Sequence, residues 1–120
     1  MSLRRMKTYA GGQGYVYQYY FVGQRATLPG EPAGTEYIFD VTSDRKTTFA
    51  VSVFLPDEVA ENWAAVHGRA LSEAERYAGA KLRLLQAFDE IEDMLHQGRR
   101  LMISAGELDR TFETLGLTGK

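Results

Sequence analysis

Hydrophobic and polar residues alternate over two stretches of the first half of the chain, residues 35–41 and 47–55. Side chains of a β-strand point alternately to opposite faces, so this period of two predicts two strands that each bury one face. A hairpin that keeps both apolar sets on the same side must pair odd positions with odd positions, as Val41 with Thr47 does. The connection is therefore expected to be a loop of three or five residues around Ser43-Asp44-Arg45.

Residues 15–22 read Tyr-Val-Tyr-Gln-Tyr-Tyr-Phe-Val, a run of aromatic and β-branched side chains that favours a pleated strand. Its odd positions are all aromatic, and we expect them to face the core as the odd positions of the next two strands do. The alternative is an exposed aromatic platform on which nucleic-acid bases stack. Residues 1–14, basic at first and then rich in glycine, are expected to form a flexible arm ahead of one domain over residues 15–120.

The apolar period becomes helical from residue 56 onwards, where a first helix is expected over residues 56–67. Ser72 and Glu75 have the spacing of a capping box, which predicts the start of a second helical segment that runs to Gly98. At about 1.5 Å per residue such a segment would be about 37 Å long, so we expect it to bend or to project from the domain. The apolar residues 101–103 then predict a short fourth strand.

A second capping-box pattern, Ser104-Ala105-Gly106-Glu107, opens a last short helix that Gly116 ends. The predicted order is three strands, two helices, a strand and a helix. This order predicts an α+β fold of two layers, in which an antiparallel sheet of three to four strands packs on helices. The expected core consists of Tyr17, Tyr19, Phe21, Tyr37, Phe39, Phe49, Val51, Val53, Trp63, Leu82, Leu85 and Phe88.

Composition and charge exclude several functional classes without changing this fold. The 120 residues are 44% apolar and 25% charged, which is typical of one globular domain, and a net charge of −2 is no general footprint for a phosphate backbone. The chain has no cysteine, which excludes thiol catalysis and thiolate metal sites and fits the cytoplasmic location that we expect. No apolar run approaches the roughly 18 residues of a membrane span, so no membrane association is expected.

The even positions of the predicted sheet suggest a function. Val16, Tyr20, Val22, Ile38 and Phe54 would point away from the helices and form an apolar patch, which in a small protein marks an interface. We expect a second copy of the chain to cover this patch in a homodimer; the last helix or the N-terminal arm folding over it is the alternative. The leading hypothesis is thus a non-enzymatic interaction module that self-associates through the outer face of its sheet or through its long helix. The sequence identifies no other protein partner.

A small module that binds RNA or single-stranded DNA is the second hypothesis. Tyr15 and Tyr20 would stack on bases, while Arg4, Arg5 and Lys7 would contact phosphates. The small number of basic residues makes this hypothesis less favoured than self-association.

Motifs that carry chemistry are few. Asp93-Met94-Leu95-His96 has the carboxylate-x-x-His spacing of metal-binding helical bundles, but it occurs once, so a solvated acidic face is favoured and neither a metal nor another cofactor is expected. A third hypothesis is a small-ligand binder or enzyme with a cleft between helix and sheet, in which His67 or His96 titrates. Trp63 is expected to anchor the core, with ligand stacking as its alternative role. Because no catalytic motif is present, an enzyme is less favoured than an interaction module.

Overall fold

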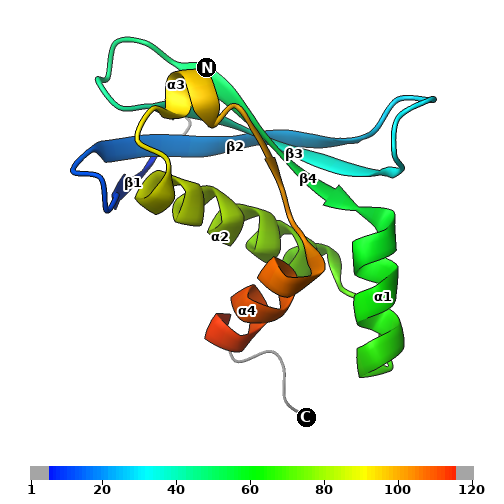
Figure 1. Ribbon diagram of the computed structural model, residues 1–120. Helices are drawn as coiled ribbons and strands as arrows, with labels where there is room; N and C mark the ends of the chain where they lie inside the picture. The colour runs from blue at the N-terminus through cyan, green and yellow to red at the C-terminus, as the bar shows by residue number, and fades with distance from the viewer. Residues whose placement is uncertain (1–5, 116–120) are drawn as a thin grey trace.

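The computed structural model describes residues 6–115 and shows a five-stranded sheet with helices against one of its faces (Figure 1). The strands follow one another across the sheet in chain order; β1 to β4 pair antiparallel, and β5 pairs parallel with β4. The strands are β1 (Lys7–Ala10), β2 (Val16–Ala26), β3 (Gly34–Thr42), β4 (Phe49–Pro56) and β5 (Arg100–Met102). The helices are α1 (Asp57–His67), α2 (Glu73–Glu90), α3 (Met94–Gln97) and α4 (Ala105–Leu115).

This architecture confirms the predicted α+β class, with one strand more than the expected three to four. The additional strand is β1, which forms within residues 1–14, where the sequence predicts a flexible arm. Asp89 at the end of α2 holds it in place: its carboxylate accepts a hydrogen bond of 2.8 Å from the Tyr9 hydroxyl and one of 2.9 Å from the Gly12 backbone N–H. These donors also offset the unfavourable position of a carboxylate at the negative end of a helix.

The β3–β4 hairpin has the predicted parity but not the predicted register. Odd positions face odd positions, yet Val41 lies opposite Phe49 rather than Thr47. The loop between Val41 and Phe49 therefore spans residues 42–48 and is longer than the predicted three or five residues. The Asp44 carboxylate explains the difference, because its Oδ1 accepts hydrogen bonds of 2.8 Å from two backbone N–H groups, those of Lys46 and Thr47. Those groups close the turn instead of extending the ladder.

The expected long helix is interrupted after α2. The chain leaves the helix at Ile91, whose backbone is extended with φ −106° and ψ 116°. Asp93 then starts the single turn of α3, its Oδ1 accepting a hydrogen bond of 3.3 Å from the backbone N–H of His96. The segment therefore bends, and the idea that the chain self-associates through a long projecting helix loses its structural basis.

Tyr17 and Tyr19 of β2 enter the core, as predicted, and Phe21 is partly buried against it, whereas Tyr15 ahead of the strand is 44% exposed. The reading of this aromatic row as an exposed platform is therefore wrong for all but Tyr15. Tyr17 and Tyr19 are 2% and 4% exposed, and Tyr17 stacks on Phe88 of α2 with ring centroids 4.1 Å apart. Burial raises the pKa of both tyrosines. On α2 the fully buried leucine is Leu84, whereas Leu82 and Leu85 are only partly buried.

Candidate functional site

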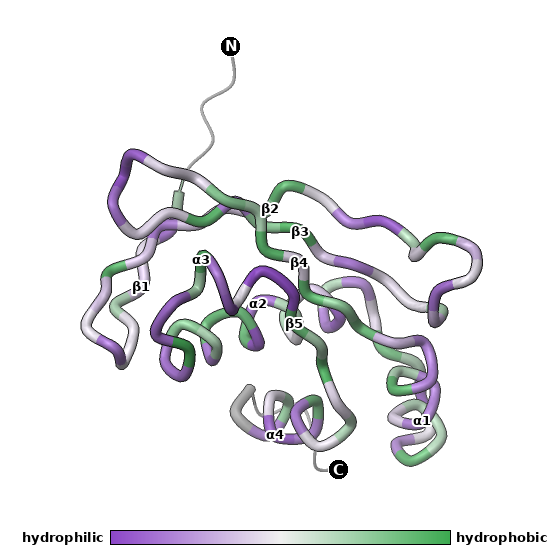
Figure 2. Tube along the Cα trace, turned by 45° about the horizontal axis from the view of Figure 1, so that its top comes forward, coloured by the Kyte–Doolittle hydropathy of each residue, from purple (hydrophilic) through white to green (hydrophobic). Residues whose placement is uncertain are grey.

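The face of the sheet opposite the helices is the surface on which the sequence predicts an interface. Figures 1 and 2 show α1, α2 and α4 on one side of the sheet, and no element among residues 6–115 covers the other side. We call this other side the outer face. The alternative that the last helix folds over it is wrong, because α4 packs on α1 and α2 beneath the sheet.

The strand register arranges the side chains of the outer face in rows. Residues of neighbouring strands that lie directly opposite each other share a face, so each row crosses the sheet. The three central rows are Tyr20, Asp40 and Ala50; Gly23, Ile38, Ser52 and Arg100; and Arg25, Glu36, Phe54 and Met102.

All five residues predicted for an interface lie on or at the edge of this face, but they are not equally exposed. Val16 and Val22 are 51% and 43% exposed, whereas Tyr20, Ile38 and Phe54 are partly covered by their neighbours. Val22 is the extra residue at a β-bulge, where the register of β2 against β3 shifts. Sequence alternation alone does not show this bulge.

β5 adds two residues to the outer face that were not predicted, Arg100 and Met102. They belong to β5, which adds to the edge of β4 and extends the face by one strand. Met102 is 53% exposed beside Phe54. Three residues of alternating pattern are too short a signal to assign such a strand to a face.

The centre of the outer face consists of a ridge with a hollow beside it. Ile38 stands between two small residues, Gly23 and Ser52, and a Cβ added to Gly23 would meet no atom within 4 Å. A larger hollow of about 360 Å³ lies next to this ridge, lined chiefly by Phe54, Met102 and the β2–β3 loop. Such a surface can take up side chains that project from another molecule.

The charges on the outer face balance. Arg25 pairs with Glu36 through Nε and Oε1 at 2.7 Å, and the Tyr20 hydroxyl donates a hydrogen bond of 2.7 Å to Asp40. With Arg100, the central rows carry two cations and two carboxylates, so these rows are neutral although the chain carries a net charge of −2. A second copy of this face would therefore meet no net repulsion.

The residues expected to bind nucleic acid are not brought together. Tyr20 lies on the outer face beside Asp40, whereas Tyr15 lies near Tyr17 on the helix side, close to the carboxylates of Glu92 and Asp93. Lys7 is also on the helix side, opposite Tyr19. The remaining two predicted residues, Arg4 and Arg5, lie outside the described residues.

The Asp93–His96 pair acts as a helix cap. Besides the backbone contact, the His96 Nδ1 lies 2.9 Å from Asp93 Oδ2, and both side chains are exposed. No group of three or more potential metal ligands occurs within residues 6–115. His67, the other candidate for titration chemistry, stacks on Trp63 at the end of α1 rather than in a cleft between helix and sheet.

Comparison of the chain with protein-family models, curated proteins and solved structures finds no match. Within the described part of the chain, no helix combines the length and the apolar character needed to cross a membrane.

Proposed function

We propose that this protein is a non-enzymatic module that forms a two-fold homodimer through the outer face of its sheet. The observation that carries the proposal is a sheet face that no described element covers, on which the apolar side chains of Ile38 and Phe54 lie among charges that balance one another. A two-fold interface brings the same patch of each copy together, so every residue must suit the patch itself. A face with neutral central rows, a ridge and hollows meets that condition.

The size of the face limits how much of it must take part in a dimer. With strands about 4.8 Å apart and a rise of about 3.3 Å per residue, the outer face measures roughly 20 Å by 25 Å in projection. A standard interface buries about 800 Å² of accessible surface on each partner, more than this projection of about 500 Å². Side chains roughen the face and increase its accessible area, so most of the strands must take part and not one edge alone.

Sedimentation of the full chain tests the dimer directly. At about 100 μM, a concentration that populates even a weak dimer, we expect a species of twice the 13.5 kDa chain mass. Ile38→Lys places a charge on the central ridge, where it would be desolvated in the interface, and is expected to shift the protein to monomer.

Val66→Lys is the matched control, because Val66 is 79% exposed on α1, away from the outer face. This variant should sediment as the wild type does. A wild type that remains monomeric at this concentration contradicts the proposal, and so does an Ile38→Lys variant that is folded and still dimeric.

A further inference from the structure

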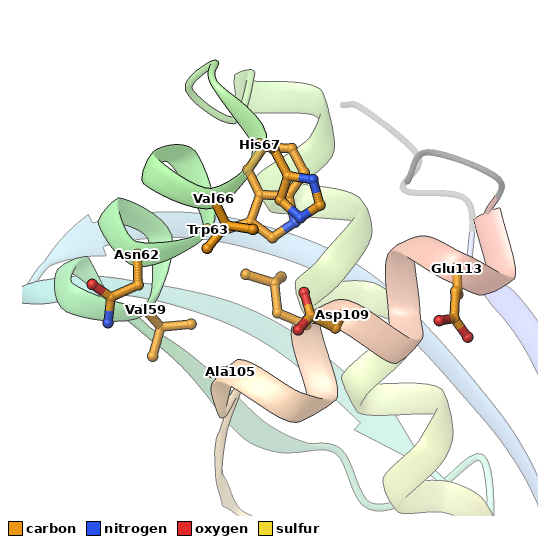
Figure 3. Close-up of a pocket in the computed structure, with 9 residues that line it drawn as sticks. Val59, Asn62, Trp63, Val66, His67, Ala105, Asp109 and Glu113 are labelled. Carbon is orange, nitrogen blue, oxygen red and sulfur yellow. The ribbon is translucent and has the colours of Figure 1, made fainter. Parts of the chain in front are cut away.

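A second hollow lies between α1 and α4, on the far side of the molecule from the outer face (Figure 3). Its volume is about 340 Å³, near the lower limit of the pockets that hold small organic ligands. The α1 wall provides Val59, Trp63 and His67, and the α4 wall provides Leu108 and two carboxylates, described below. The apolar residues form the floor, and the polar groups surround it.

The indole N–H of Trp63, at this hollow, has no hydrogen-bond partner within residues 6–115. Trp63 is 4% exposed, and its Nε1 is buried without an acceptor among the described residues. The rings of Trp63 and His67 stack with centroids 4.2 Å apart, and Figure 3 shows the two overlapping rings at the end of α1. A buried donor without a partner is destabilising by about 1–3 kcal/mol, so an acceptor from a ligand would be favourable here. The exposed His67 ring stacks on Trp63, and we expect it to move when a ligand reaches this donor.

Among the described residues, the α4 wall of the hollow carries no positive charge, and the Arg69 guanidinium, 5.0 Å from the Trp63 ring centroid, pairs with Glu75. Asp109 and Glu113 are four residues apart on α4, the spacing at which like charges repel each other along a helix. Glu113 is also in the last turn of α4, where the helix dipole disfavours a carboxylate. No salt bridge within the described part of the chain compensates either residue. A bound cation would relieve both unfavourable effects.

These observations define a ligand by its chemistry. We propose that the hollow between α1 and α4 binds a small organic cation that carries an apolar group and, close to its ammonium, a hydroxyl group. The ammonium pairs with Asp109 and Glu113, the hydroxyl oxygen accepts the hydrogen bond of Trp63, and the apolar group contacts Leu108 and Val59. This site is separate from the dimer interface and does not depend on it.

Phenylethanolamine is a suitable probe, because it combines an ammonium, a hydroxyl and an aromatic ring. Trp63 is the single tryptophan of the chain, so its indole N–H gives one resolved signal in heteronuclear NMR spectra of the intact protein. We expect a saturable shift of this signal on titration. Phenethylamine, which lacks the hydroxyl, and phenylethylene glycol, which lacks the ammonium, should each bind about tenfold more weakly.

Variants of the acidic wall provide the second arm of the experiment. Asp109→Asn should weaken binding of phenylethanolamine about tenfold, since a hydrogen bond to a charged group is worth about 1.5–3 kcal/mol. Glu61→Gln removes an equal charge from an exposed position of α1 outside the lining and should change the affinity less than about twofold. The proposal is overturned if the indole signal does not shift at about 10 mM probe, if the glycol binds as tightly as the amine, or if Asp109→Asn binds like the wild type.

Discussion

Two glycines of the sheet show how differently the same residue type is constrained. A Cβ on Gly34 would lie 2.5 Å from the backbone oxygen of Leu55 and would overlap the ring of Phe54, at the point where β3 meets β4. A Cβ on Gly23 would enter open space on the outer face. Neither glycine has a positive φ, so the space around the Cβ decides the effect of a substitution.

Gly34→Ala should therefore lower the free energy of unfolding by about 1–3 kcal/mol, because the backbone oxygen cannot move without displacing a strand. Gly23→Ala should leave it unchanged within about 0.5 kcal/mol. Urea unfolding monitored by circular dichroism measures both variants. If the two alanines had equal effects, the close approach at Gly34 would not be a real constraint on the fold.

Single residues of the outer face also show what the sequence could and could not predict about the candidate site. Alternation placed Ile38 and Phe54 on the outer face correctly, because the side-chain period of a strand is strict. It could not locate the bulge at Val22 or the turn formed by Asp44, since both depend on hydrogen bonds outside the alternating pattern. The Asp93-x-x-His96 spacing also has two meanings, a metal motif and a helix cap, which the sequence alone does not separate.

At the scale of elements, capping residues predicted where helices begin better than the apolar periodicity predicted where they end. Both predicted capping boxes form: the Ser72 hydroxyl accepts a hydrogen bond of 3.1 Å from the Glu75 N–H, and the Ser104 hydroxyl accepts one of 3.2 Å from the Glu107 N–H. The end of α2 had no such signal, because Ile91 breaks the helix without a glycine or a proline. The hollow between α1 and α4 could not be predicted from the sequence either, since it arises from the packing of two helices far apart in the chain.

The junction of α1 and α2 depends on one carboxylate. Glu75 forms two contacts of 2.8 Å with the Arg69 guanidinium and accepts a hydrogen bond of 2.9 Å from the Ser72 backbone N–H. The hydrogen bonds from Arg69, together with the one from Ser72, lower the pKa of Glu75 from 4.5 to about 2. A depressed pKa in the folded state means that the ionised form stabilises the fold, so this stabilisation is present above pH 4.5 and is lost as the pH falls towards 2.

Glu75→Gln should accordingly destabilise the protein by about 1 kcal/mol at neutral pH, since the Arg69 side chain is partly exposed and solvent screens the pair. The difference from the wild type should decrease as the pH falls below the usual glutamate value of 4.5. Urea unfolding over this range measures it, with the exposed Glu58→Gln in the first turn of α1 as control. A Glu75→Gln effect that is constant with pH would show that the charge of Glu75 does not stabilise the junction.

At the scale of the whole molecule, the sheet has an open face and one open edge. β1 pairs with only the first four residues of β2, so the edge of β2 from Tyr20 to Ala26 has no neighbouring strand among the described residues. The centre of the face, by contrast, is crossed by the longest strands. Pairing across the face about a two-fold axis is closed, whereas pairing of one edge of the sheet with its other edge would continue into fibres.

Association across the face links stability to protein concentration. Because a dimer unfolds to two chains, its melting temperature should rise with concentration, by mass action alone. We expect this rise for the wild type between about 1 μM and 100 μM and none for Ile38→Lys, whose melting curve should be independent of concentration. Differential scanning calorimetry measures both. Edge pairing would leave Ile38 exposed to water. If the melting temperature of Ile38→Lys still rises with concentration, the interface therefore lies at an edge of the sheet and not on its face.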